Sequence, residues 1–201
     1  PNPGVKKRFQ ESVIEELRRK ESGSSADVIE LHAKKHGDTL ITLAELAKLT
    51  ALSVDEVKED VKELEEQELL AVFEMRKDTY VWHMDSIREA QQTLVRALED
   101  YEKKYPYRYG MKKAEIQTMY FQKIKPNVFD RIVEFFVERG CIRRAEEFLC
   151  TPEFEVKKDG TYQKVAENFL NVFEKAGYDF VRYSEIDLKG VSRDVADDIL
   201  N

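Results

Sequence analysis

The chain has 201 residues, of which 36% are charged and 42% hydrophobic, and its formal net charge at pH 7 is −7. With 9 Tyr, 11 Phe and regularly spaced aliphatic residues, this composition is typical of a folded protein and excludes a disordered chain. The apolar runs are only a few residues long, so neither a transmembrane helix nor a signal peptide is predicted. We therefore expect a cytoplasmic protein in which Cys141 and Cys150 are free thiols.

The N-terminal third predicts short helices followed by a β-hairpin. Residues 6–20 have helical spacing, and Ser25 is expected to cap a helix that ends at Lys35. Capping boxes formed by Thr42 with Glu45 and by Ser53 with Glu56 predict the starts of two further helices. The expected elements are a strand at 39–41, helices at 43–49 and 54–67, and strands at 69–74 and 79–83 around a polar turn.

The middle of the chain repeats this order. A helix capped by Asp85 or Ser86 is predicted to reach about Tyr105, before Pro106 and Gly110 interrupt the helical pattern. The elements expected next are helices at 112–119 and 126–139 and a hairpin formed by 142–145 and 148–151. Residues 153–160 are charged and loop-like.

Residues 44–73 and 114–145 are two copies of one unit. Ala114-Glu115-Ile116 matches Ala44-Glu45-Leu46, and the following helix repeats its apolar face: Phe129, Val133 and Phe136 match Val57, Val61 and Leu64. Each copy is a helix-turn-helix followed by a hairpin, which is the winged-helix pattern. We predict a mainly α fold with small β-hairpins (α+β), built from tandem winged-helix domains.

A third copy begins near Tyr162, where an amphipathic helix is predicted to end at Gly177. It stops at Asn201, inside its expected second helix, on which Val195 and Ile199 form the apolar face. We therefore expect a fragment of a longer protein. The predicted domains are 1–84 (an N-terminal helix and the first winged helix), 85–155 (the second) and 156–201 (the truncated third).

Few residues suggest catalysis or metal binding. His32 and His36 have a helical spacing that can hold a metal, but no cysteine or carboxylate cluster completes the set and His83 is distant. All three are expected to be surface or rim histidines. Because no catalytic arrangement or phosphate-binding loop is recognisable either, we expect this chain to be no enzyme and to bind no metal or cofactor.

Charge is distributed unevenly along the chain. Residues 55–68, the expected recognition helix of the first domain, carry 8 acidic and 2 basic side chains, a net charge of −6 that disfavours contact with DNA phosphates. Residues 101–144 carry 11 basic and 5 acidic side chains, a net charge of +6. The segment 101–144 is therefore the strongest candidate for a nucleic-acid contact.

In this segment basic residues alternate with Tyr101, Tyr105, Tyr107 and Tyr109. Lysine and arginine neutralise phosphates and tyrosine can stack on bases, so RNA contact is one interpretation. The other is a solvated basic surface over tyrosines packed in the core. The predicted RNA-contacting residues are Lys112, Lys113, Lys123, Lys125, Arg131, Arg139, Arg143 and Arg144.

The stretch from Leu98 to Pro106, continuing through Tyr107-Arg108-Tyr109-Gly110-Met111-Lys112-Lys113 to Ile116, resembles the second winged-helix domain of SelB, the selenocysteine-specific translation elongation factor of bacteria. Val137-Glu138-Arg139-Gly140 is also similar to that domain. The resemblance implies a GTPase whose C-terminal arm of winged helices reaches a selenocysteine-insertion hairpin in the messenger RNA.

On this resemblance, GTP, Mg²⁺ and selenocysteyl-tRNA would be bound by an N-terminal part outside this sequence. The ribosome and the hairpin would be contacted mostly through regions outside it too, and this segment would space and orient the hairpin-reading end relative to the GTPase. A tandem winged-helix DNA-binding regulator and a protein–protein adaptor remain as alternatives.

Overall fold

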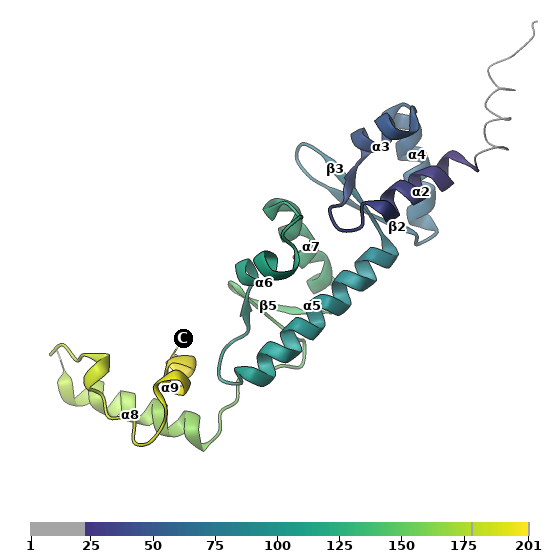
Figure 1. Cartoon of the computed structure of the whole chain (residues 1–201). Helices are drawn as coiled ribbons and strands as arrows, with labels where there is room; N and C mark the ends of the chain where they lie inside the picture. Colours follow the sequence, from purple (N-terminus) through teal and green to yellow (C-terminus); the bar gives the residue numbers. More distant parts are fainter. Residues whose placement is uncertain (1–22, 178, 201) are drawn as a thin grey trace, which may run out of the picture. The chain divides into compact units, whose positions relative to one another are not determined.

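The structure is a computed structural model that describes residues 23–177 and 179–200 (Figure 1). The predicted helix at 6–20 lies outside the described residues. The chain divides into two compact units, one running to Ala90 and including Phe121–Arg131, the other containing Gln91–Tyr120 and the residues from Ile132 onward. The structure confirms a mainly helical fold with small antiparallel sheets. The three domain boundaries drawn from the repeats stay a prediction.

The first unit is a winged helix. Its elements are α2 (Ser25–Lys35), β1 (Ile41–Thr42), α3 (Leu43–Thr50), α4 (Val54–Glu66), β2 (Leu70–Glu74) and β3 (Thr79–His83). The sheet has the antiparallel order β1-β3-β2. Ile29 of α2, Val57 of α4 and Val81 of β3 are fully buried in one cluster, so the helices pack on the sheet through aliphatic side chains.

The helix starts follow the predicted capping chemistry. The boxes of Thr42 with Glu45 and of Ser53 with Glu56 are both present. The cap of α2, however, is Ser24 rather than Ser25, because the Ser24 hydroxyl accepts a hydrogen bond from the Asp27 amide at 3.2 Å.

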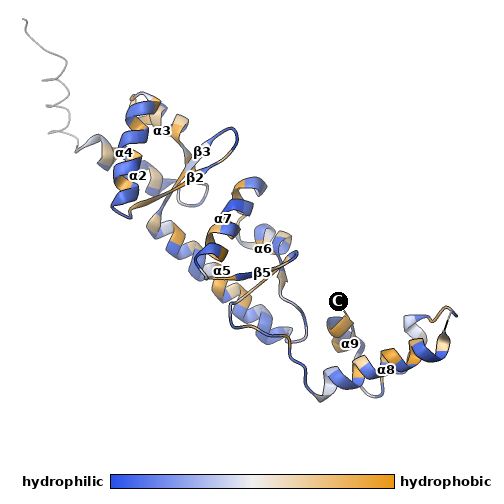
Figure 2. Cartoon of the chain, turned by 180° about the vertical axis from the view of Figure 1, so that it is seen from behind, coloured by the Kyte–Doolittle hydropathy of each residue, from blue (hydrophilic) through white to orange (hydrophobic). Residues whose placement is uncertain are grey.

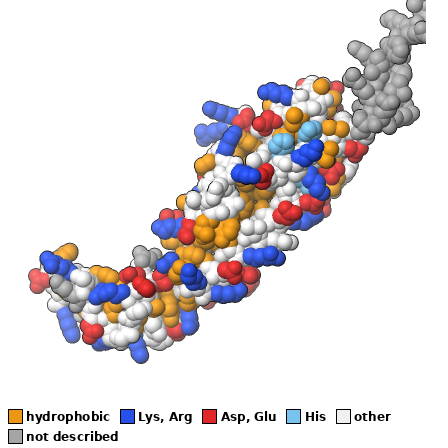
Figure 3. Space-filling view, in the orientation of Figure 1, with side chains coloured by type: hydrophobic (Ala, Val, Ile, Leu, Met, Phe, Trp, Pro, Cys, Tyr) orange, Lys and Arg blue, Asp and Glu red, His pale blue; other side chains and the backbone are white. Residues whose placement is uncertain are grey.

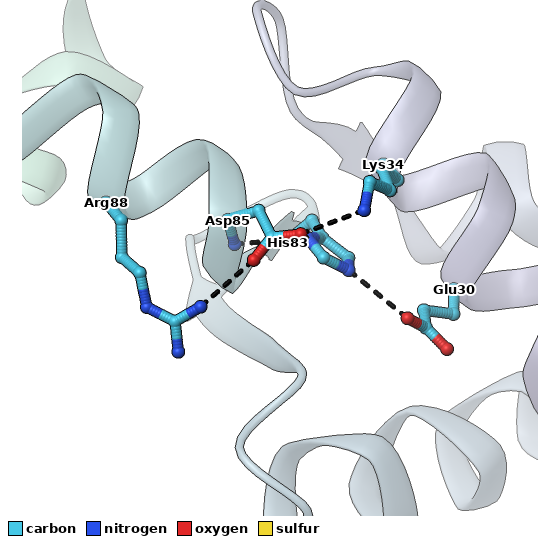
Figure 4. A network of polar contacts seen from close by, with 5 residues as sticks. All are labelled: Glu30, Lys34, His83, Asp85 and Arg88. Atoms are coloured by element: carbon cyan, nitrogen blue, oxygen red, sulfur yellow. Dashed lines mark hydrogen bonds and ion pairs between the residues drawn. The ribbon is translucent and has the colours of Figure 1, made fainter.

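The start of α5 (Met84–Lys104) differs from the prediction, because the helix follows β3 directly and its first turn is capped by a histidine. The amide of Asp85 donates to His83 Nδ1 at 3.1 Å, so Nε2 carries the ring proton and faces Glu30 Oε1 at 3.3 Å (Figure 4). The Asp85 carboxylate is not a cap: it contacts Lys34 and Arg88, each at 2.9 Å. The hydrogen bond from Lys34 lowers the pKa of Asp85.

His83 also corrects the expectation of a surface histidine, since it is only 3% exposed. The sequence predicts His83 at the end of the wing, and the histidine is buried because β3 passes directly into α5. His32 and His36 are half-buried. Among the described residues, no group of three or more histidine, cysteine or acidic side chains could hold a metal.

The second unit repeats the topology of the first. Beyond α5 and α7 (Pro126–Glu138), its elements are β4 (Met111–Lys112), α6 (Lys113–Tyr120), β5 (Arg143–Ala145), β6 (Phe148–Cys150), α8 (Gly160–Ala176), η1 (Tyr183–Glu185) and α9 (Arg193–Leu200). Its sheet order β4-β6-β5 corresponds to β1-β3-β2 of the first unit, and its β5–β6 hairpin is the one that the sequence repeat predicts. Strand β4 was not predicted, because two residues are too few to show an alternating pattern.

The third copy has a small core of its own. Asp159 caps α8, its side chain accepting from the amides of Thr161 and Tyr162. Along α8, hydrophilic and hydrophobic residues alternate (Figure 2). The buried residues of this core are Val165, Phe169, Ile186 and Ala196. Ala196 is fully buried, whereas Val195 and Ile199, the residues predicted to form the apolar face of α9, are only half-buried. The buried face of α9 is therefore centred on Ala196, which was not among the predicted residues.

Two other expectations concern the chain's chemistry. Both Cys141 and Cys150 are free thiols, as predicted. Within residues 23–177 and 179–200, no helix is long and apolar enough to cross a membrane.

Candidate nucleic-acid interface

Helix α4 of the first unit exposes an acidic face. Val57, Val61 and Leu64 are buried against the core, whereas most of the acidic side chains between them are exposed. Lys62 lies 3.9 Å from Glu66 on the same helix. This surface would repel phosphates, as its sequence indicated.

The eight predicted RNA-contacting residues fall into both units. Lys123, Lys125 and Arg131 belong to the first, and Lys112, Lys113, Arg139, Arg143 and Arg144 belong to the second. On the face seen in Figure 3, basic and acidic side chains are intermingled rather than gathered by sign. The structure thus brings together two smaller groups of the predicted residues. Whether either group contacts RNA stays a prediction.

The two lysines of the first group already have partners in the first winged helix. Lys123 forms an ion pair with Asp38, which lowers the pKa of that carboxyl. Lys125 donates to the Tyr80 hydroxyl at 3.1 Å and lies 5.6 Å from the centre of its ring. The hydrogen bond to Tyr80 raises the pKa of Lys125, which therefore stays charged at neutral pH. These contacts join residues far apart in the chain, so no local sequence pattern predicts them.

The second group surrounds the wing of the second domain. Lys112 on β4 lies 3.3 Å from Glu147 in the turn between β5 and β6, and Arg144 donates to the Glu146 carbonyl at 2.9 Å. Arg143 donates to the carbonyl of Phe154, and the guanidinium of Arg139 lies 4.2 Å from the centre of the Phe135 ring. Lys113 begins α6 beside the same turn, with its amide bound to Glu147 O at 2.9 Å. All but the half-buried Lys113 are exposed to solvent.

Three of the four tyrosines have structural roles. The rings of Tyr101 and Tyr105 are 4.8 Å apart, and the Arg108 guanidinium lies 4.0 Å from the centre of the Tyr105 ring. Tyr107 donates to Asp159 at 3.1 Å. The fourth, Tyr109, is 54% exposed and rests against Phe148 with ring centres 6.4 Å apart. Tyr101, Tyr105 and Tyr107 are therefore half-buried and engaged in side-chain contacts rather than packed in the core, and Tyr109 is exposed.

Arg108 links the end of α5 to α9. Its guanidinium donates to the Tyr101 hydroxyl at 2.9 Å and to the Asp198 carboxylate at 2.7 Å. Burial opposes the charge of Arg108, but these two hydrogen bonds outweigh it and raise the pKa. Through this contact Asp198, which lies on the expected recognition helix of the third copy, is bound to the second domain.

Comparison with known protein families finds a match over the segment that contains the predicted RNA-contacting residues. Residues 95–149 match the family model described as elongation factor SelB, winged helix, and named for the second such domain. This segment is therefore similar to the second winged-helix domain of SelB. It includes all eight predicted RNA-contacting residues and the four tyrosines.

Among solved structures, the chain is similar to the mRNA-binding domain of elongation factor SelB from E. coli, determined in complex with SECIS RNA. The match has 18% sequence identity and a TM-score of 0.46, and it covers 64% of this chain and 98% of that one. None of the curated proteins compared with the sequence matches it.

Proposed function

We propose that this chain is part of the winged-helix arm of a selenocysteine-specific elongation factor, and that its SelB domain contacts RNA through the wing. The observation that carries the proposal is the family match over residues 95–149. It coincides with the strongly basic segment of the chain, whose exposed side chains surround the β5–β6 wing. In this assignment the arm spaces and orients the end that reads the messenger hairpin relative to the GTPase.

The contacts at the two ends of α5 support an arm role. At its start, His83 and Asp85 tie the helix to Glu30 and Lys34 of α2. At its other end, Tyr101 and Arg108 tie it to Asp198 of α9. Each end of the helix is thus fastened within its own unit by charged hydrogen bonds, which are stronger and more directional than apolar contacts.

The acidic α4 favours this assignment over a DNA-binding regulator, because a winged helix of that class presents the corresponding helix to phosphates. The ribosome and a messenger stem-loop are the proposed RNA partners, and the chain is proposed to have no catalytic role and no cofactor of its own. GTP, Mg²⁺ and selenocysteyl-tRNA belong, in this proposal, to another part of the whole factor. Its expected place is the cytoplasm.

The test is a binding experiment with a fluorescent RNA stem-loop and, in parallel, co-sedimentation with purified ribosomes. Charge reversal at the wing, Arg139→Glu with Arg144→Glu, should weaken binding and reduce the slope of log affinity against log salt by roughly 1.4–1.8, since each lost phosphate contact removes about 0.7–0.9. The matched control is Lys58→Glu with Lys62→Glu on α4, which changes the net charge by the same amount.

If both double variants bind less tightly by the same factor, the effect is one of net charge and the wing has no special role. If neither the stem-loop nor ribosomes bind the parent chain at low salt, the RNA function itself is wrong.

A further inference from the structure

The outer face of the small sheet in the second winged-helix domain carries two aromatic rings and a cation. Phe148 on β6 stands opposite Lys112 on β4 and Ala145 on β5, so these three side chains form one row across the sheet. Lys112 Nζ lies 5.7 Å from the centre of the Phe148 ring, and the Tyr109 ring lies beside it. The row ends at Ala145, whose methyl group is the smallest of the three side chains.

Tyr109 is held in this place by the glycine that follows it. Gly110 has φ +144°, and a Cβ at this position would stand 2.4 Å from the carbonyl oxygen of Leu149. Only glycine lets the backbone pass so close to β6. The tight approach brings the Tyr109 ring against Phe148 while more than half of the tyrosine surface stays open to solvent.

We propose that Tyr109, Phe148 and Lys112 form a stacking site for an unpaired nucleobase of single-stranded or looped RNA. A flat aromatic surface binds the face of any base, and a neighbouring lysine binds the phosphate that comes with it. Bases inside a duplex are already stacked and cannot enter such a site. The inference rests on the proposed RNA function and names the part of RNA that the wing would bind.

Charge at the site favours an anionic ligand. Lys112 is 58% exposed, and its partner Glu147 is 63% exposed. An ion pair this open to water is weak and can be replaced by a phosphate at little cost. Arg143 lies on the adjacent strand β5, two residues before Ala145, so the alternation of side chains along the strand places it on the same face as Phe148.

The test compares three probes of equal length: a single-stranded oligoadenylate, the same backbone without bases, and a fully paired RNA duplex. Binding of the whole chain to each is measured by fluorescence anisotropy at low salt. Tyr109→Ala should weaken oligoadenylate binding roughly 5- to 100-fold, which corresponds to the loss of one base–aromatic stack. Binding of the base-free backbone and of the duplex should change little. Tyr109→Phe should bind like the parent, because stacking needs the ring and not the hydroxyl.

Tyr120→Ala is the matched control, since Tyr120 is 41% exposed on α6 of the same unit. Thermal unfolding of each variant confirms that the domain remains folded. If Tyr109→Ala binds oligoadenylate as the parent does, or weakens all three probes alike, the stacking site is wrong while the RNA function stands. If the parent binds none of the three probes, both the stacking site and the RNA function are wrong.

Discussion

Replacing Gly110 with alanine should destabilise the second winged-helix domain far more than a glycine change usually does. Two costs combine at this position. A non-glycine residue at a positive φ of this kind is strained by about 1–3 kcal/mol. In addition, the new Cβ at 2.4 Å from Leu149 O must retreat by about 1 Å to reach the ordinary contact distance of 3.4 Å, a shift of backbone against backbone.

Such a shift pulls β4 away from β6, where Met111 pairs with Leu149 and Lys112 with Phe148. The loss of one or two backbone hydrogen bonds adds about 1–2 kcal/mol. We therefore expect Gly110→Ala to lower the free energy of unfolding of this domain by about 2–5 kcal/mol. It should also displace Tyr109 and weaken oligoadenylate binding, which links the fold of the wing to the proposed stacking site.

Gly140→Ala is the control for backbone strain alone. Gly140 also has a positive φ, +67°, but a Cβ there meets no atom within 4 Å. Its cost should be about 1–2 kcal/mol. The assay is urea unfolding followed by the amide signals of β6 in NMR spectra, with the fluorescence of Trp82, the single tryptophan, as an internal reporter of the first winged helix. If the two variants are destabilised equally, the close approach to Leu149 contributes nothing and the argument fails.

Three further predictions concern the linkage between the second domain and the third copy. The pKa of Asp159 is lowered to about 2 from its ordinary value of 3.8, chiefly by the hydrogen bond from Lys157. Its stabilising effect on α8 is therefore complete above about pH 5 and is lost as the pH falls through the folded-state pKa of about 2. Amide shifts of Thr161 and Tyr162 should follow this titration and should lose it in Asp159→Asn. Arg108→Ala should speed hydrogen exchange in α9 about 5- to 30-fold, because it removes the hydrogen bonds to Tyr101 and Asp198, worth about 1–2 kcal/mol together; unchanged exchange in α9 would contradict the link. Brief trypsin treatment should cut first after Lys157 or Lys158, which lie in an exposed segment without helix or strand next to the predicted domain boundary between residues 155 and 156. A first cut inside α7 would contradict that boundary.

The local elements could be predicted because their signals are local. The capping boxes at Thr42 and Ser53 need only residues three positions apart, and the hairpin strands around 75–78 show their alternation within a few residues. The internal repeat then predicted the hairpin of the second sheet, but not its third strand, β4. Where the prediction was wrong, as for the start of α5, the deciding contact is the hydrogen bond from Asp85 to His83 together with the packing of His83 against Glu30, a residue 53 positions away.

The candidate site was predictable in composition but not in arrangement. A net charge of +6 over residues 101–144 located the region. That Lys123 pairs with Asp38, 85 positions away, has no sequence signal, and neither has the choice of Tyr109 as the exposed tyrosine among four. The informative signal for Tyr109 was Gly110, since a glycine between a tyrosine and a strand often marks a close backbone approach.

The direct passage from β3 into α5 also limits how the length of this chain can change. His83 ends the strand and caps the helix, so no loop residue lies between the two elements. One inserted residue here would turn the helix by about 100° about its axis relative to the strand. Ile87, which is 2% exposed, would leave the core, and Asp85 would leave Lys34. Related chains should therefore tolerate insertions at the wing turn 75–78 and show a fixed length at this junction, which makes it a reliable reference point for aligning distantly related sequences.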